Sequence, residues 1–514
     1  MPSMIERIGQ MLYVGFRGLT APDYILEWLS EGRVGGIILF ARNVDTPQQL
    51  ADLTASLHAA AKTPILVCID QEGGSVSRLR KLFAESPGSM ALSSSANAED
   101  ITERMAVVLG SELRALGINW DYAPVVDVTY NADNPTVGTR SFGTEPERIG
   151  ELASAMVRGL QQEGVAACAK HFPGLGDTAI DTHVALAHID QTVEHLLEVD
   201  LQPYRQVIDT GIASIMTTHT IFTELDADYP ATLSPVIIQK LIRDKLGFQG
   251  MVCSDCMEMK AIADNYGKGE SAVLGALAGL DAILISHTRS HQEEAMQALY
   301  DAFESGRLSE AIVDAANERI AAMKAAYGIT LPLDISGIAS EEHKQVGLEA
   351  ARAGVVMLRQ DQSVFPLRDA GHVGLIEFAS IIDSEVVEQG GLTGLANAVE
   401  EKAPFVTTIS LMSRDNAPEK VESALDLAAE ANVLILVTRN AHLSEEQREL
   451  ALKLADASQR LVVLCLRNPY DAALFPQAGT VVCTSGDSTP SLVAVMEALQ
   501  GEFEPTGKLP VEVG

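Results

Sequence analysis

The sequence has few of the features that mark secreted, membrane or disulfide-bonded proteins. Its 514 residues include six cysteines, and all but Cys256 lie in short apolar runs, so we expect reduced core thiols and no disulfide framework. No apolar run reaches the roughly 18 residues that favour a membrane span, and Glu6 and Arg7 stand where a signal peptide needs an apolar segment. These absences favour a globular, cytoplasmic protein.

Basic residues are also scarce. The sequence has 37 Lys and Arg against 70 Asp and Glu, which gives a formal net charge of −33. Such a chain repels nucleic acid and anionic lipid, so we expect neither as a partner. The apolar fraction of 47% is ample for the cores of two or three domains. Composition leaves the oligomeric state open.

Short apolar runs recur through the first 290 residues, each followed by a stretch with helical period. Eight such runs predict strands at 11–16, 34–40, 64–70, 118–128, 165–172, 213–220, 250–256 and 282–287. Helices are expected between them, for example at 46–61 with Thr46 as the cap and at 234–246 with Ser234 as N-cap and Pro235 at the first position. This alternation predicts an α/β fold with an N-terminal (β/α)8 TIM-type barrel; a doubly wound sheet is the alternative.

The pattern changes after about residue 330. Five further strands are predicted at 373–378, 405–411, 432–438, 460–466 and 480–485, with helices between them. They indicate a smaller α/β sandwich domain. We therefore expect a barrel over 1–332, a linker over 333–345 and a C-terminal domain over 346–514.

Polar residues stand at the ends of the predicted barrel strands. They are Arg42, Asp70, Asp127, Lys170, His171, His219, Asp255 and His287. A barrel brings the carboxyl ends of all its strands to one face, where its active site lies. The set therefore predicts a catalytic site at that face.

Several of these residues belong to longer strings. The strings are "IDQEGGSVSRL" (69–79), "VGTRSFG" (137–143), "KHFPGLGDTAIDTH" (170–183), "YPATLS" (229–234), "LGFQGMVCSDCMEMKAI" (246–262) and "GEFEPTGKLPVEV" (501–513). In this order, over nearly the whole chain, they resemble glycoside hydrolase family 3 in its β-N-acetylglucosaminidase branch. The resemblance implies a retaining exo-enzyme that removes terminal β-linked N-acetylglucosamine from peptidoglycan or chitin fragments, with no metal and no cofactor.

The resemblance also implies a role for particular residues. Asp255 matches the nucleophile that forms a covalent glycosyl-enzyme, and Asp181 with His183 matches an acid/base pair. The residues expected to line the sugar subsite are Asp70, Arg78, Arg140, Lys170, His171 and His219. Two positions depart from the family pattern: Ser75 replaces an Arg, and Cys256 replaces an Asp or Ala after the nucleophile.

Elementary chemistry agrees with these roles. A retaining displacement needs a carboxylate on one face of the sugar and a proton donor for the leaving oxygen. Histidine titrates near neutrality, and an aspartate two residues away can fix the tautomer of His183. The competing interpretations are a solvated loop for Asp181 and His183, a helix N-cap for Asp255, and a structural salt bridge between Asp70 and Arg140.

Other functions remain open at this level. A neutral histidine does not repel phosphate as a carboxylate does, so a β-N-acetylglucosaminide phosphorylase is an alternative. The β-glucosidase branch of the same family would take its acid/base from the second domain, where Glu445 and Glu446 are the candidates. A metal-dependent barrel hydrolase and a catalytically silent cell-wall-binding protein are more remote, and the first strand lacks the His-x-His pair of many metal barrels.

Overall fold

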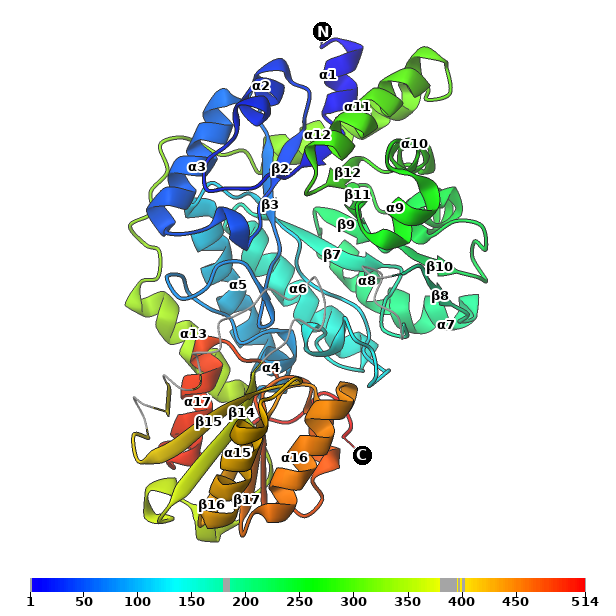
Figure 1. The fold of residues 1–514 in the computed structure, drawn as a ribbon. Coiled ribbons are helices and arrows are strands. Elements are labelled where there is room, and N and C mark those ends of the chain that lie inside the picture. Colours follow the sequence, from blue (N-terminus) through cyan, green and yellow to red (C-terminus); the bar gives the residue numbers. More distant parts are fainter. Residues whose placement is uncertain (1, 179–184, 380–394, 396–397, 400–402, 514) are drawn as a thin grey trace.

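A computed structural model describes residues 2–178, 185–379, 395, 398–399 and 403–513. The chain forms a barrel followed by a separate layered sheet (Figure 1). The barrel strands are β1 (Leu12–Val14), β2 (Gly36–Ile38), β3 (Leu66–Ile69), β6 (Trp120–Asp121), β7 (Ala166–Phe172), β9 (Ser214–Thr217), β11 (Met251–Cys256) and β12 (Ala282–Ile285). All eight predicted strands are confirmed. They close in the order β1-β12-β11-β9-β7-β6-β3-β2, so the doubly wound alternative is wrong.

Helices surround the barrel. They are α1 (Met4–Gly9), α2 (Asp23–Glu31), α3 (Pro47–Ala60), α4 (Ser89–Ser94), α5 (Ala98–Ala115), α6 (Pro146–Gln162), α7 (Val193–His195), α8 (Leu201–Asp209), α9 (Lys260–Tyr266), α10 (Lys268–Ala278), α11 (Arg289–Glu304) and α12 (Glu310–Ala326). Two short pairs, β4 (Gln71–Gly73) with β5 (Val76–Ser77) and β8 (Ala187–Ile189) with β10 (Thr220–Phe222), lie outside the barrel. None of the helices in the described part of the chain combines the length and apolar character of a membrane span.

Two predicted helix starts have different outcomes. The Thr46 side chain accepts a hydrogen bond from the backbone N–H of Gln49, so the predicted cap of α3 is confirmed. The second segment is a π-helix, η5 (Val236–Lys245), whose N-cap is Pro235 rather than Ser234. Ser234 still accepts a hydrogen bond from Ile237 at 3.1 Å. The apolar spacing places a helix there but does not distinguish a π-helix from the much commoner α-helix.

The second domain is an α/β sandwich, as predicted. Its sheet has the order β13-β18-β17-β16-β14-β15. The strands are β13 (Val356–Arg359), β14 (Val373–Ala379), β15 (Val406–Met412), β16 (Val433–Thr438), β17 (Leu461–Cys465) and β18 (Thr480–Cys483); the helices are α13 (Glu341–Gly354), α15 (Pro418–Glu430), α16 (Glu445–Ala457) and α17 (Thr489–Leu499). Separate apolar cores fill the two faces of this sheet.

The edge strand β13 is absent from the sequence-based prediction. It runs antiparallel to β18, and only Val356 of its four residues is fully buried. A strand so short and half-exposed produces little apolar signal. The contacts of helix α13 extend to α4 and α5 of the barrel as well as to α17. The expected domain boundaries at 332 and 346 stay a prediction.

The barrel interior is closed by aromatic packing. Tyr13 and Trp120 meet edge to face with ring centroids 5.3 Å apart, and Trp120 and Tyr122 meet in the same way at 4.9 Å. All three are at most 1% exposed, and the Trp120 indole N–H donates to Ser214 Oγ at 2.8 Å. Trp120 therefore joins strands on two sides of the barrel below the site.

Replacing this indole should destabilise the barrel. We expect Trp120→Ala to lower the free energy of unfolding by about 4 kcal/mol, because the substitution leaves a cavity that rigid strands cannot fill. Urea unfolding followed by circular dichroism measures the change. Phe405→Ala, at a residue that is 41% exposed, is the matched control and should cost less than about 1 kcal/mol. Equal losses in the two variants would contradict a central packing role for Trp120.

Candidate active site

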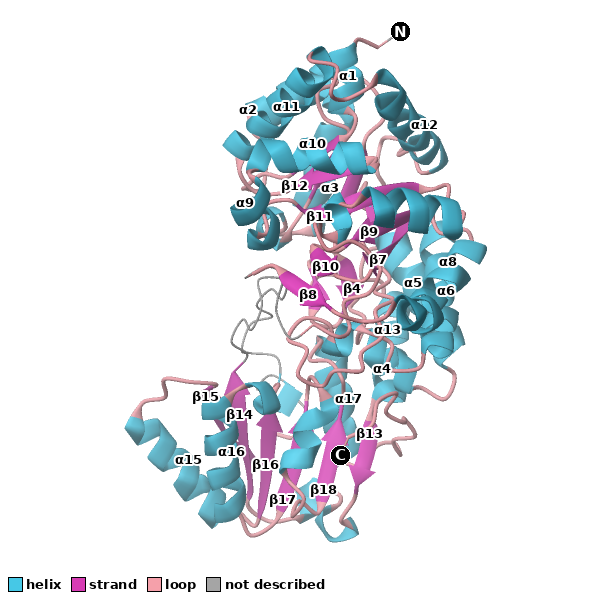
Figure 2. Cartoon of the chain, turned by 90° about the vertical axis from the view of Figure 1, so that its right-hand side faces the viewer, coloured by secondary structure: helices cyan, strands magenta, loops and turns pink. Residues whose placement is uncertain are grey.

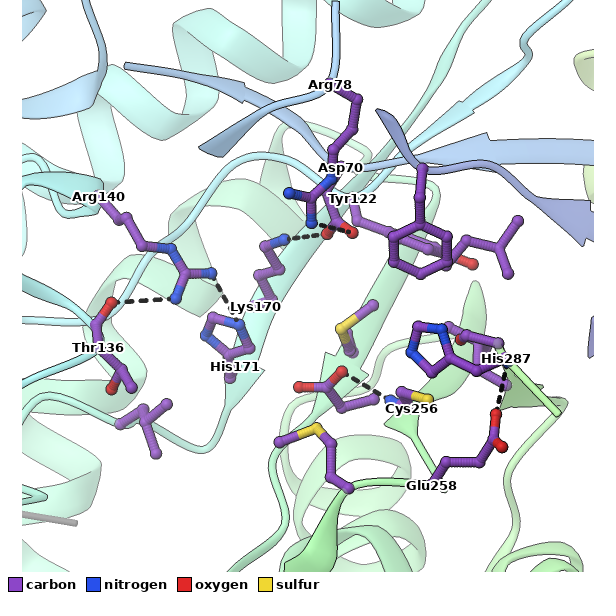
Figure 3. Close-up of a pocket in the computed structure, with 18 of the residues that line it drawn as sticks. Asp70, Arg78, Tyr122, Thr136, Arg140, Lys170, His171, Cys256, Glu258 and His287 are labelled. Carbon is purple, nitrogen blue, oxygen red and sulfur yellow. Dashed lines mark hydrogen bonds and ion pairs between the residues drawn. The ribbon is translucent and has the colours of Figure 1, made fainter. Parts of the chain in front are cut away.

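A cavity of about 210 Å³ opens at the carboxyl ends of the barrel strands (Figure 3). Six of the predicted site residues line it: Asp70, Arg78, Arg140, Lys170, His171 and Asp255. The structure thus brings together side chains from the ends of β3, β7 and β11 and from the loops after β3 and β6. Asp181 and His183 lie outside the described residues.

Asp70 stands directly after β3 with a cation on each oxygen. Lys170 Nζ donates to its Oδ1 at 2.7 Å, and Arg78 Nη2 donates to its Oδ2 at 3.3 Å (Figure 3). Burial opposes ionisation of this carboxyl, but the charges of Lys170 and Arg78 outweigh it and hold the pKa of Asp70 below its usual range. An ionised carboxylate has about four acceptor positions, so oxygens paired in this way can still accept hydrogen bonds from a ligand.

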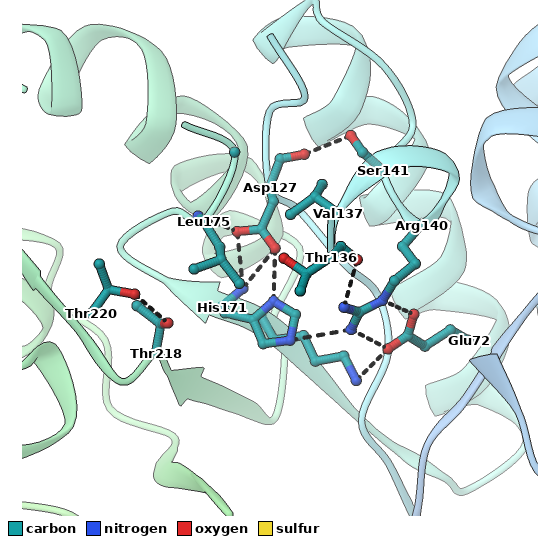
Figure 4. A network of polar contacts seen from close by, with 12 residues as sticks. Glu72, Asp127, Thr136, Val137, Arg140, Ser141, His171, Leu175, Thr218 and Thr220 are labelled. Carbon is teal, nitrogen blue, oxygen red and sulfur yellow. Dashed lines mark hydrogen bonds and ion pairs between the residues drawn. The ribbon is translucent and has the colours of Figure 1, made fainter. Parts of the chain in front are cut away.

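Glu72 is the second carboxylate of this cluster. Arg140 grips it with Nε and Nη2 at 2.9 and 2.8 Å, and Lys170 Nζ lies 2.6 Å from its Oε1 (Figure 4). Burial alone would raise the pKa of Glu72, but Arg140 and Lys170 hold it well below its usual range. Glu72 was not predicted as a site residue. Its place two residues after Asp70, in the quoted string 69–79, is the signal that could have found it.

The Asp70–Arg140 salt bridge considered from the sequence does not form. Asp70 pairs with Lys170 and Arg78, and Arg140 pairs with Glu72. The reason is the hairpin of β4 and β5, which returns Arg78 to the Asp70 carboxylate and places Glu72 between the other two cations. Both predicted residues still line the cavity.

His171 is held by Asp127 and Arg140. Its Nδ1 lies 2.7 Å from Asp127 Oδ2, and its Nε2 lies 3.2 Å from Arg140 Nη2 (Figure 4). A guanidinium only donates, so Nε2 must accept, and the ring proton lies on Nδ1 facing Asp127. Asp127 also accepts from the backbone N–H groups of His171 and Leu175. Asp127, which was predicted at a strand end, lies in the loop after β6 and orients His171 instead of lining the cavity itself.

Asp255, the predicted nucleophile, lies near the end of β11 and lines the cavity. Its Oδ1 accepts from the Cys256 backbone N–H at 2.6 Å. The helix-cap interpretation is wrong, because the next helix, α9, begins at Lys260 and has Met259 at its N-cap. Burial raises the pKa of the neighbouring Cys256 thiol to about 12, so the departure from the family pattern adds no charge beside Asp255.

His219 does not line the cavity. It is completely buried, with Nδ1 2.8 Å from Thr232 Oγ1 and Nε2 2.9 Å from the carbonyl oxygen of Cys256. It thus lies behind the end of β11 and contacts the residue that follows Asp255. A direct contact with sugar stays a prediction.

The rim of the cavity contains residues that were not assigned to the site. The Arg42 guanidinium lies 4.1 Å from the centre of the Phe40 ring, and the His287 ring lies 5.0 Å from it. Glu258 accepts from the His287 backbone N–H at 2.5 Å (Figure 3). It also contacts His291 Nδ1 at 2.8 Å. Arg42 and His287 were recognised as strand-end residues, and Glu258 lies in the quoted string 246–262.

The barrel thus carries a strand-end carboxylate and paired cations and acids around one small cavity, at the face where barrel enzymes have their active sites. Residues 3–323 match the family model described as the glycosyl hydrolase family 3 N terminal domain. The chain belongs to that family.

Relatives extend the similarity beyond the barrel. A solved glycoside hydrolase family 3 beta-N-acetylglucosaminidase from Paenibacillus sp. str. FPU-7 is 35% identical, with a TM-score of 0.93 over 99% of each chain. A beta-hexosaminidase of Nitrosomonas eutropha is 37% identical over 307 residues, which are 58% of this chain and 87% of the relative. Beta-hexosaminidase A of Pseudoalteromonas piscicida is 32% identical over 383 residues, 69% of this chain but 64% of that longer protein.

Loss of the Glu72 charge should destabilise the fold in a pH-dependent way. In Glu72→Gln, two buried cations lose a partner, so we expect a loss of about 3 kcal/mol at pH 7. The pKa of Glu72 is lower in the folded chain than its unfolded value of about 4.3, so its ionisation stabilises the fold above that pH and ceases to do so as the pH falls toward the folded-state value.

Urea unfolding at pH 7 and at a series of pH values below 4.3 tests this linkage. The difference between wild type and Glu72→Gln should shrink as the pH falls. Exposed Glu27 supplies the control, since Glu27→Gln should change stability by less than about 0.5 kcal/mol at either end of the series. A difference that stays constant with pH would show that the carboxylate charge is not what stabilises the cluster.

Proposed function

We propose that this chain is a retaining exo-β-N-acetylglucosaminidase that hydrolyses terminal β-linked N-acetylglucosamine. The observation that carries the proposal is the 35% identity over 99% of both chains with a solved β-N-acetylglucosaminidase of the family. The curated relatives at 32% and 37% identity, both named beta-hexosaminidases, support the same activity. The second domain belongs to the compared length, so the similarity is not limited to the barrel.

In the proposed mechanism, Asp255 attacks the anomeric carbon. The bond from that carbon to the leaving oxygen breaks as an ester to Asp255 forms, and His183 gives its proton to the oxygen. Water then attacks the ester with His183 as base, which frees the sugar with its original anomeric configuration. Asp181 would fix the His183 tautomer. The position of Asp255 at the cavity supports the first step, and the sequence resemblance supports the roles of His183 and Asp181.

The sugar subsite proposed for Asp70, Arg78, Arg140, Lys170 and His171 is supported by their hydrogen-bonding capacity. Lys170 has three N–H donors and uses two on Asp70 and Glu72. Arg140 has five and uses four, on Glu72, on His171 and on the Thr136 carbonyl. The remaining donors and the Asp70 lone pairs match the alternating donors and acceptors of sugar hydroxyls.

The natural substrate is proposed to be a fragment of peptidoglycan or chitin in the cytoplasm. All six cysteines are free, and Cys168 Sγ lies 3.9 Å from Cys253 Sγ without a bond, which supports a reducing compartment.

We propose that the barrel domain spans 1–332, the linker 333–345 and the second domain 346–514. We propose that no metal, cofactor, nucleic acid or membrane takes part.

Loss of the nucleophile should abolish turnover. We expect Asp255→Asn to reduce kcat on a nitrophenyl β-N-acetylglucosaminide by at least about a thousandfold, since the amide cannot form the ester, while the melting temperature stays close to wild type. Asp264→Asn, at an exposed position of α9, is the matched control and should keep wild-type activity. Activity of Asp255→Asn within about tenfold of wild type, a barrier change of only ~1.4 kcal/mol, would exclude Asp255 as nucleophile.

The proposed acid should matter most for poor leaving groups. Nitrophenolate needs little protonation, so His183→Ala should slow the nitrophenyl glycoside far less than a disaccharide of N-acetylglucosamine. Equal losses on both substrates would exclude His183 as the acid.

Wild type should turn over the nitrophenyl β-N-acetylglucosaminide faster than the nitrophenyl β-glucoside. Its product in phosphate buffer should be free N-acetylglucosamine. Sugar 1-phosphate as the product would make the chain a phosphorylase.

A further inference from the structure

The loops at the carboxyl ends of the parallel strands of the second domain lie toward the barrel (Figure 2). The loop after β16 reaches the barrel where His442 Nε2 lies 3.2 Å from the carbonyl oxygen of Ala132. The loop after β18 does so where Thr489 Oγ1 donates to Glu85 at 2.7 Å. These contacts fall on the two barrel loops that follow β3 and β6, and those loops carry Glu72 and Arg140.

His442 is fixed from within its own domain. Its Nδ1 lies 2.6 Å from Asp471 Oδ1, and the backbone N–H groups of Ala441 and His442 donate to the same carboxylate at 2.9 Å each. Asp471 is completely buried. Asp471 therefore holds both the backbone and the imidazole of His442, and the other ring nitrogen lies next to Ala132 of the barrel loop.

The second contact between the second domain and this barrel loop is the packing of Asn468 against Gly138. A Cβ on Gly138 would lie 2.4 Å from Asn468 Oδ1 and 2.9 Å from its Nδ2, so the amide fills the space where any side chain would stand. Asn468 is 5% exposed, and its backbone N–H donates to Asn440 Oδ1 at 3.1 Å. Gly138 begins the short 3₁₀ turn that ends at Arg140. The second domain thus touches the chain two residues before the site arginine.

A third contact fixes the end of the same loop. The backbone N–H and the hydroxyl of Thr144 both donate to the carbonyl oxygen of Pro510 at 3.2 Å. Between β6 and α6, over residues 122–145, the only helix or strand is that 3₁₀ turn of Gly138–Arg140. Hydrogen bonds within the barrel hold part of this loop, since Asn134 Nδ2 donates to the carbonyl oxygens of Leu175 and Gly176 and the Thr129 N–H donates to that of Gly143. The contacts with the second domain add to them at Ala132, Gly138 and Thr144.

The position of this loop matters because the hydrogen bonds of Arg140 tolerate only small displacements of its guanidinium. Its Nη2 and Nε donate to the Glu72 carboxylate at 2.8 and 2.9 Å, and Nη2 also lies 3.2 Å from His171 Nε2. All these donors belong to one planar guanidinium. A small displacement of the loop would break the two-point grip on Glu72 and change the orientation of His171 at the cavity. The second domain can therefore influence sugar binding without reaching the cavity.

We propose that His442 and Asn468 are positioning residues for Arg140, through which the second domain sets the affinity of the cavity for sugar. This inference rests on the proposed function for its substrate. Neither residue lines the cavity that holds Asp255; each meets the backbone of the loop over 129–144, at Ala132 and at Gly138.

The first experiment removes the imidazole in the full-length protein. His442→Ala should raise KM for the nitrophenyl β-N-acetylglucosaminide at least fivefold and change kcat less than twofold. His442→Gln, which keeps an N–H donor for Ala132, should recover most of the affinity. The control is His372→Ala at an exposed histidine whose contacts are with Asn432 and Thr407 of its own sheet. A KM equal to wild type in His442→Ala would overturn the proposal.

Hydrogen exchange gives a readout that needs no substrate. In His442→Ala the amides of 129–144 should exchange faster than in wild type and in His372→Ala, while those of α11 keep their rates. If wild type fails to cleave any N-acetylglucosaminide, the proposed function fails, yet the exchange result still tests the loop. Unchanged exchange over 129–144 would show that His442 does not hold it.

A double substitution tests the Asn468 contact. Gly138→Ala should raise KM at least tenfold, because the new Cβ meets the Asn468 amide and because alanine is strained at the positive φ of +43°. Adding Asn468→Ala removes the amide atoms, so KM of the double variant should be at least threefold lower than that of Gly138→Ala. A double variant no better than Gly138→Ala alone would contradict the contact.

Discussion

The carboxylate of Glu72, buried between Arg140 and Lys170, is the interaction on which the rest of the site depends. Lys170 is 1% and Arg140 6% exposed, and burial of two such cations without an anion would be prohibitive. Glu72 offsets that cost and aligns them, so that Lys170 also reaches Asp70 and Arg140 also reaches His171. Four side chains, from the ends of β3 and β7 and from the loop after β6, are thereby fixed by one carboxylate. These contacts position the side chains without a bound sugar, and such preorganisation lowers the cost of binding.

Much of this arrangement follows from the sequence because barrel geometry is strict. The eight apolar runs could be assigned since parallel barrel strands are buried on both faces, and Asp70, Lys170 and Asp255 were found because strand ends meet at one face. Glu72 was not predicted because it lies in a hairpin after the strand, where no hydrophobic periodicity indicates its position. The half-exposed edge strand β13 and the π-helix at 236–245 were missed for related reasons: the first has one buried residue, and the second shares its apolar spacing with an α-helix.

The ion-pair partners of the charged site residues also could not be predicted from the sequence. Asp70 follows β3 and Arg140 lies in the loop after β6, and the two were considered as a pair. Each has another partner, because the β4–β5 hairpin brings Arg78 to Asp70 and Glu72 to Arg140. His219 shows the same limit, since strand position alone cannot tell a side chain that faces the cavity from one that supports it from behind.

The central claim is that Asp255 forms a covalent bond to a sugar bound in this cavity. Rapid quenching of the enzyme with an aryl β-N-acetylglucosaminide that has a fast leaving group, followed by mass spectrometry of its peptides, tests the claim directly. The account predicts one N-acetylglucosaminyl group on the tryptic peptide 246–260, attached at Asp255 and absent from Asp255→Asn. A label on another carboxylate, or turnover with inversion and no label at any time, would contradict it.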